Sequence, residues 1–308
     1  MFNNSEELKE LIKQGKTNDE IITKRLSYLE SNNSNTIEPI FNGTQVIFYD
    51  GYINSSTLIS ADDGYIDETL YLTDIDELYS ELIDVVRKNI DKNGLPLKII
   101  LKKVWDYFAE SKTSQYAELI KFIKQLVPEK KYFARTYLPY IIQRYNCSNY
   151  DGNITDFGKA FIWNQFGTSE TKQRHSDEID KYLTSLDFKK IDTSNICRLS
   201  SLKGAGIAAC TEKSLAIQNC LSFLGTKSYI VAGILSNGQT EEHHNFNVLK
   251  DKNGNYKIID GAQATIIKLE NIDKPEALLY LDGIEGINGV GNSITYTAYY
   301  AQKNKNKH

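Results

Sequence analysis

The sequence predicts an α+β protein with a mainly helical N-terminal domain (residues 1–150, including a short β-hairpin region) and a mixed second domain (residues 151–308). Apolar residues recur at helical spacing through most of the first half. After residue 225 the pattern changes to the alternation of polar and apolar residues that is typical of strands. A length of 308 residues also suits about two domains.

Glycine and proline divide the N-terminal half into separate helices. Gly15 interrupts the first helical stretch, and Pro96 is placed to open a later one. Between them, two short β-like runs at residues 45–49 and 69–72 are accompanied by Asp-Gly turns, which predicts the hairpin region. The expected helical stretches are residues 5–30, 74–90, 96–108, 114–126 and 130–145.

The second half opens after a polar, turn-rich segment at residues 147–153. Helices are expected near residues 156–165 and 170–185. A stronger helix begins at Cys210 and ends at Gly225, the residue type that helices favour just after their C-terminus. Its apolar residues cover a wide stripe, so we expect this helix to be buried, with antiparallel strands after it.

Composition excludes several classes of function. The net charge is −4 and no basic cluster stands out, so nucleic acid is not an expected partner. The N-terminus has no signal-peptide pattern, and no apolar run approaches the ~20 residues that span a bilayer. The four cysteines form no CxxC pair, so zinc is not expected, and neither is any other metal or organic cofactor. A reduced cytoplasmic setting is the default, with signal-less export left open.

Two motif-like stretches are better explained without function. Residues 11–26 resemble the first half of a helix-turn-helix, but no basic recognition helix follows. Residues 62–68 have the acidic character of a calcium loop without its alternating ligand spacing, which favours a turn.

Cys210 is the main candidate for chemistry. Small residues, among them Gly204 and Gly206, lead directly into the helix that it begins. At that position, the unpaired amides and the positive end of the helix dipole stabilise a thiolate, and the small residues leave room for a substrate. The alternative is a buried structural cysteine, which is the better interpretation for Cys220 in the middle of the same helix.

His244 is the candidate general base. Residues 243–249 alternate as a strand, which places His244 on one face with Phe246 and Val248 and turns His243 to the other. Apolar neighbours predict that the His244 imidazole points inward, where a thiol could meet it. A buried histidine that only makes structural hydrogen bonds is the alternative.

Asp260 is the candidate carboxylate that would orient His244. It ends a β-like run that follows a turn composition at residues 251–255. His244 and Asp260 are 16 positions apart, so an antiparallel hairpin puts them on one face only if its loop has an odd residue count or a bulge. A two-residue turn at Asn253–Gly254 would separate them. The alternative role for Asp260 is to shape a turn before Gly261.

Residues 200–265, about a fifth of the chain, resemble the transglutaminase-like superfamily, whose cores share a papain-like Cys-His-Asp triad. The resemblance implies a helix bearing the cysteine packed on an antiparallel sheet, with Cys210 as nucleophile, His244 as base and Asp260 as orienting carboxylate. Phe246 stands where tryptophan is usual, and Gly261 where proline often follows. The matching residues are Gly206, Cys210, Leu215, Ala216, Leu224, Gly225, residues 229–233, His244, Asn245, Phe246, Asn247 and Asp260.

The expected function is therefore thiol-dependent acyl transfer on an amide of a protein or peptide: transglutaminase, deamidase or cysteine peptidase activity. The Cys210 amide would supply one oxyanion donor, and Trp163, Asn164 and Gln165 are candidates for the second. Two alternatives stay open. An arylamine N-acetyltransferase would need an Arg-Gly-Gly lead-in that is absent before Cys210, and a non-catalytic binding module would not need the triad. The sequence predicts neither the acyl acceptor nor the oligomeric state.

Overall fold

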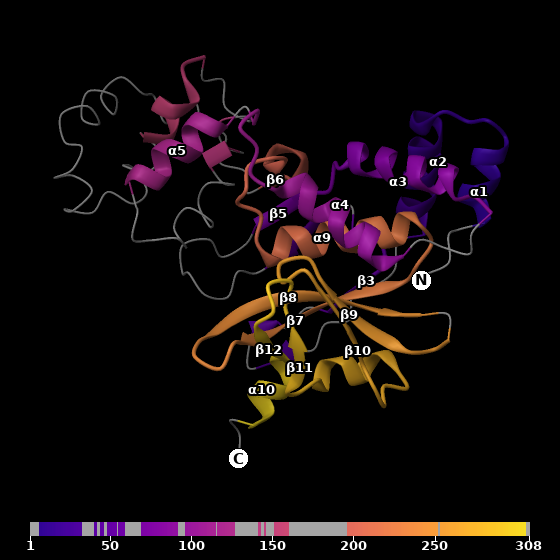
Figure 1. Ribbon diagram of the computed structural model, residues 1–308, viewed down its shortest axis with the longest axis vertical. Coiled ribbons are helices and arrows are strands. Elements are labelled where there is room, and N and C mark those ends of the chain that lie inside the picture. The colour runs from indigo at the N-terminus through magenta and orange to yellow at the C-terminus, as the bar shows by residue number, and fades with distance from the viewer. Residues whose placement is uncertain are drawn as a thin grey trace.

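The computed structural model confirms the α+β class, with an antiparallel sheet and several helices (Figure 1). None of the described helices is long and apolar enough to cross a membrane. The structure describes residues 6–32, 40–41, 44–45, 48–53, 55–58, 69–91, 96–114, 116–126, 141–142, 145, 151–159, 196–251 and 253–305.

The N-terminal helices begin and end close to where apolar spacing, glycine and proline predict. Gly15 has a positive φ of 73° and separates the first two helices, and Thr17 opens the second with a capping box closed by Glu20. Pro96 precedes the fourth. The stretch 130–145 lies mostly outside the described residues. The helices are α1 (Glu6–Lys13), α2 (Asn18–Ser31), α3 (Asp76–Lys88), α4 (Leu97–Phe108) and α5 (Ala117–Leu126).

A seven-stranded antiparallel sheet forms the centre of the second half, in the order β10-β9-β8-β7-β12-β11 with β3 also paired to β7. Its strands are β3 (Phe48–Asp50), β7 (Ser228–Ser236), β8 (Glu241–Lys250), β9 (Tyr256–Asp260), β10 (Thr265–Lys268), β11 (Ile284–Ile287) and β12 (Ser293–Ala298). The other described elements are β1 (Ile40–Phe41), β2 (Thr44–Gln45), β4 (Ser55–Leu58), β5 (Thr69–Leu72), β6 (Ile196–Arg198), the 3-10 helices η2 (Leu199–Leu202) and η3 (Pro275–Tyr280), α9 (Cys210–Phe223) and α10 (Tyr299–Lys305).

The two faces of this sheet pack against different partners. On one face, Ile230, Leu249 and Ile259 belong to a large apolar cluster with α1, α3, α4 and α9. On the other face, Phe246 and Val248 belong to a second cluster with η3 and β12. Figure 1 shows α9 and α4 on one side of the sheet and α10 on the other. The sheet therefore separates two apolar layers.

Segments from both halves of the chain pair with one another in the sheets. β3 pairs with β7, and β5 pairs in parallel with β6. The predicted boundary near residue 150 lies outside the described residues and stays a prediction. The described segments on its two sides meet in one apolar cluster and in two sheets, the seven-stranded sheet and the three-stranded sheet β4-β5-β6.

α9 begins at Cys210, as the sequence predicts, and both of its ends are held by named contacts. At its C-terminus, Gly225 has a φ of 78°. The amides of Gly225 and Thr226 donate to the carbonyls of Ser222 (2.9 Å) and Leu221 (2.8 Å), which is a Schellman motif. The buried Arg25 guanidinium of α2 also donates to the Phe223 carbonyl at 2.9 Å.

Candidate active site

The loop before Cys210 is fixed on the C-terminal end of α4. The amides of Gly204 and Gly206 donate to the carbonyls of Tyr107 (2.9 Å) and Phe108 (3.0 Å). Gly206 has a φ of 69°, and a Cβ there would lie 2.6 Å from the Cβ of Glu110. Glycine is therefore required at this position both by backbone conformation and by close packing. The small lead-in residues thus allow the loop to approach α4 closely.

The first turn of α9 is held by Glu212, which is buried. Its Oε2 accepts a hydrogen bond from the Ala209 amide at 2.8 Å, and its Oε1 accepts one from the Tyr71 hydroxyl at 2.7 Å. Cys210 is half-buried, whereas Cys220 is fully buried and its burial raises the pKa of its thiol. No described residue accepts a hydrogen bond from the Cys210 amide. That amide remains an available donor beside the thiol.

His244 lies on β8 and is buried. It shares a face with Phe246 and Val248, as strand alternation predicts. α9, however, packs on the opposite face of β8: the Asn245 amide donates to the Thr211 hydroxyl at 2.8 Å. Residues 241–246 of β8 pair with β7 on one edge, and no described strand pairs with the other edge. Burial of His244 is confirmed. However, α9 packs on the face of β8 that carries Asn245, and not on the face that carries His244.

His244 and Asp260 form a buried pair. His244 Nε2 lies 2.6 Å from Asp260 Oδ2, and the side chains are 2% and 0% exposed. The register pairs Asn247 with Ile259, so Asp260 falls opposite Phe246 and on the face of His244. The loop at 251–255 has an odd number of residues. The odd loop meets the predicted condition, and the pairing of β8 with β9 contains no bulge.

Four donors converge on the Asp260 carboxylate. Besides His244, the Tyr296 hydroxyl donates to Oδ2 at 2.7 Å. The amides of Ala262 and Gln263 donate to Oδ1 at 2.7 and 3.1 Å. Burial alone would raise the pKa of Asp260, but the charge of His244 and these donors outweigh burial and hold the pKa below its ordinary value. Asp260 is thus held as a carboxylate.

The charge on His244 follows from the same pair. Burial alone would lower the pKa of the imidazole, but Asp260 first, and Cys210 second, raise it well above its ordinary value. Cys210 thus lies close enough to His244 for its charge to act on the ring. Because Nε2 faces Asp260, Nδ1 is the ring nitrogen left for the thiol. The three predicted residues are therefore close together, with the imidazole paired to the carboxylate.

His243 lies elsewhere. It is half-buried, and its ring centroid is 5.3 Å from that of Tyr299. Trp163, Asn164 and Gln165, the candidates for a second oxyanion donor, lie outside the described residues. Sequence reasoning missed Tyr296, a buried tyrosine on β12 whose hydroxyl needs a polar partner. The alternation of residues 293–298 predicts which face of its strand Tyr296 occupies, but no local signal in the sequence identifies Asp260 as the partner of its hydroxyl.

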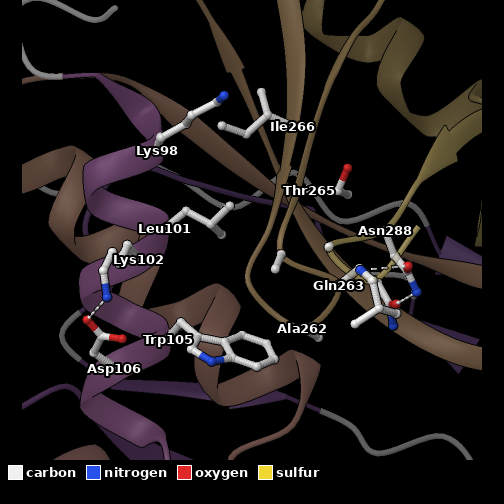
Figure 2. A pocket seen from close by; sticks show the side chains of 13 residues that line it. Lys98, Leu101, Lys102, Trp105, Asp106, Ala262, Gln263, Thr265, Ile266 and Asn288 are labelled. Atoms are coloured by element: carbon white, nitrogen blue, oxygen red, sulfur yellow. Dashed lines mark hydrogen bonds and ion pairs between the residues drawn. The ribbon is translucent and has the colours of Figure 1, made fainter. Parts of the chain in front are cut away.

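A pocket of about 830 Å³ lies between α4 and the turn that follows Asp260; we call it the α4 pocket. α4 forms one wall, and the turns after β9 and β11 form the other (Figure 2). Trp105 was missed by sequence reasoning, although a tryptophan off the apolar stripe of α4 is a signal. Among the described residues, no cluster of His, Cys, Asp and Glu could hold a metal ion. The lining residues are Lys98, Leu101, Lys102, Trp105, Asp106, Ala262, Gln263, Ala264, Thr265, Ile266, Asn288, Gly289 and Val290.

No protein-family model, no curated protein and no solved structure matches this chain. The geometry of Cys210, His244 and Asp260 is consequently the basis for any statement about function.

Proposed function

We propose that this protein is a thiol-dependent acyl-transfer enzyme with a papain-like or transglutaminase-like site that acts on an amide of a protein or peptide. The observation that carries the proposal is the 2.6 Å contact between His244 and Asp260, with Cys210 close enough to raise the pKa of the imidazole. A carboxylate in this position fixes the tautomer and orientation of the imidazole, and the imidazole can then exchange a proton with the nucleophile.

Chemistry in this site would proceed in two steps. The Cys210 sulfur attacks the amide carbon, and the Sγ–C bond forms as the C–N bond breaks. The His244 imidazolium gives its proton to the departing amine or ammonia, leaving a thioester on Cys210. Water or a primary amine then attacks the thioester, loses its proton to His244 and releases the thiolate. The Cys210 amide supports the proposal as a donor for the oxyanion in both steps.

A glutamine-containing peptide tests the reaction and identifies the acceptor. With wild-type protein, mass spectrometry should show deamidation or cleavage with water alone, or an amine adduct when a primary amine is added. Cys210→Ala should abolish each product, and Tyr280→Ala, a change at an exposed residue, should abolish none. Activity that survives Cys210→Ala would refute the proposal.

Thiol labelling separates an enzyme from a binding module that only resembles one. The half-buried Cys210 should react with iodoacetamide far faster than the fully buried Cys220. Cys210→Ala should remove the fast labelling located at residue 210 by peptide mapping, and Cys220→Ala should keep it. Equal slow labelling of both thiols would favour a non-catalytic module.

A further inference from the structure

The α4 pocket has the dimensions and lining of a ligand site. Its volume of about 830 Å³ falls within the roughly 300–1,000 Å³ that ligand pockets occupy. Figure 2 shows the Trp105 ring extending from α4 toward the turn at Ala262, with Asn288 and Gln263 joined across the two turns. Asn288 Nδ2 donates to Gln263 Oε1 at 3.4 Å, and the Gly289 amide donates to the Gln263 carbonyl at 2.8 Å. These bonds hold the wall opposite α4 together.

Apolar surface is exposed on both walls of this pocket. Trp105 is 42% exposed and Val290 is 81% exposed, although both are large apolar side chains. The buried Leu101 and the half-buried Ile266 lie between the same walls. Exposed apolar residues grouped around a hollow are typical of binding sites, and tryptophan is the residue that most often dominates binding energy. The occupant should therefore carry a large apolar side chain.

The charge around the pocket is positive, against a chain net charge of −4. Lys98 and Lys102 line it, and Lys213 lies over the Trp105 ring with Nζ 4.4 Å from the ring centroid. Asp106 is the one acidic residue among the described lining residues, and it pairs with Lys102 at 2.5 Å. No described acidic residue pairs with Lys98. Such a rim complements an acidic ligand.

The pocket adjoins the triad through two connections. Ala262 and Gln263 line it and also donate their amides to the Asp260 carboxylate. Lys213 follows Cys210 by three residues, about one helical turn of ~5.4 Å, and reaches Trp105. A ligand in the pocket would therefore lie on the side of α9 that presents the thiol.

We propose that the α4 pocket binds an acidic peptide segment of the substrate, with one large apolar side chain packed against Trp105 and acidic side chains beside Lys98 and Lys102. This inference rests on the proposed function, because it assigns the pocket to the substrate of the Cys210 site. Binding there would position the amide for attack by the thiol.

Binding can be measured without chemistry in a Cys210→Ala/Trp163→Phe variant. This variant retains Trp105 as its only tryptophan, since the chain has two. Titration with a ten-residue glutamine peptide that carries one phenylalanine and two aspartates should change the Trp105 emission and saturate. Peptides with lysine for aspartate, or serine for phenylalanine, should bind about tenfold more weakly or worse.

Variants then localise the binding by calorimetry in the Cys210→Ala background. Trp105→Ala should weaken binding of the phenylalanine–aspartate peptide about tenfold or more. Lys98→Glu should weaken it several-fold, with the loss diminished at high salt. Tyr280→Ala, which removes an exposed aromatic residue outside the pocket, should leave binding unchanged. Equal binding of all three peptides, or equal affinity in the Trp105→Ala and Tyr280→Ala variants, would overturn the inference.

Turnover by the wild-type protein distinguishes the two proposals. If the peptide binds at Trp105 but wild-type protein leaves it unchanged, the pocket assignment stands as peptide binding and the acyl-transfer proposal fails. If glutamine peptides are turned over with the same kcat/KM whether or not they carry phenylalanine and aspartate, acyl transfer stands and the pocket assignment fails.

Discussion

Replacing Asp260 with asparagine tests the buried ion pair most directly. All four groups around the carboxylate are donors: His244, the Tyr296 hydroxyl and the amides of Ala262 and Gln263. Asparagine keeps one acceptor oxygen and turns an NH₂ group toward the remaining donors, so at least one pair must break. Loss of one partner of a buried ion pair costs about 3 kcal/mol or more. Asp260→Asn should therefore lower the free energy of unfolding by about 3 kcal/mol.

The size of this loss should depend on pH in a defined way. The pKa of Asp260 is lowered in the folded protein, so its contribution is present above the unfolded value of about 3.9 and is lost as pH falls through the folded value. The pKa of His244 is raised, so its contribution is complete below the unfolded value of about 6.5 and is lost as pH rises through the folded value. The difference between wild type and Asp260→Asn should be largest between about pH 4 and pH 6.5.

Urea denaturation at a series of pH values measures this difference. With a denaturant slope of about 3 kcal/mol/M, a loss of 3 kcal/mol moves the midpoint by about 1 M. Asp273→Asn, the same change at an exposed position, should alter stability by less than about 0.5 kcal/mol. Equal midpoints for wild type and Asp260→Asn at pH 6, or a difference that grows steadily from pH 6.5 to pH 9, would refute the ion-pair reasoning.

Three further substitutions test the supports of the site. Tyr296→Phe removes one donor from the buried carboxylate and should cost about 1.5 kcal/mol; the pKa of Asp260 should rise, so acid unfolding should begin at a higher pH. Gly206→Ala would place a Cβ 2.6 Å from Glu110 at a residue with positive φ, and it should lower the free energy of unfolding in urea by about 3 kcal/mol. Gly238 also has a positive φ but has open space around it, so Gly238→Ala should lower the free energy of unfolding by only about 1 kcal/mol. Arg25→Ala leaves the last carbonyls of α9 without their buried donor and should lower the thermal midpoint strongly. Replacing the neighbouring, exposed Lys24 with alanine should not lower it. Equal effects of Gly206→Ala and Gly238→Ala, equal effects of Arg25→Ala and Lys24→Ala, or an unchanged acid transition in Tyr296→Phe would contradict the contacts described.

The parts of the site that were predictable depend on local periodicity. Strand alternation places His244 with Phe246 and Val248, and the spacing of 16 to Asp260 requires an odd hairpin loop, which residues 251–255 provide. Both statements need only the two-residue period of a strand. The start of α9 at Cys210 is local in the same sense, because small residues precede a helical period there.

The contacts that sequence reasoning missed join segments distant along the chain. Tyr296 contacts Asp260 across a separation of 36 residues. The alternation of polar and apolar residues in its strand indicates which face Tyr296 occupies, but it does not indicate which residue lies opposite. Trp105 reaches the turn after Asp260 only because α4 packs on that side of the sheet. Pairings of this kind depend on topology, which a pattern along one segment does not contain.

The surroundings of α9 show why its polar residues were hardest to interpret. The apolar stripe predicts one buried face, yet Gln218 and Asn219 are fully buried as well. Gln218 donates to the carbonyls of Gly51 (2.8 Å) and Ser228 (2.7 Å), and Asn219 pairs with the backbone of Ile53. The N-terminal segment that follows β3 thus covers the side of α9 that would otherwise meet water. Because most of α9 is enclosed, its half-exposed first turn is the part of the helix that solvent reaches, and that turn carries Cys210.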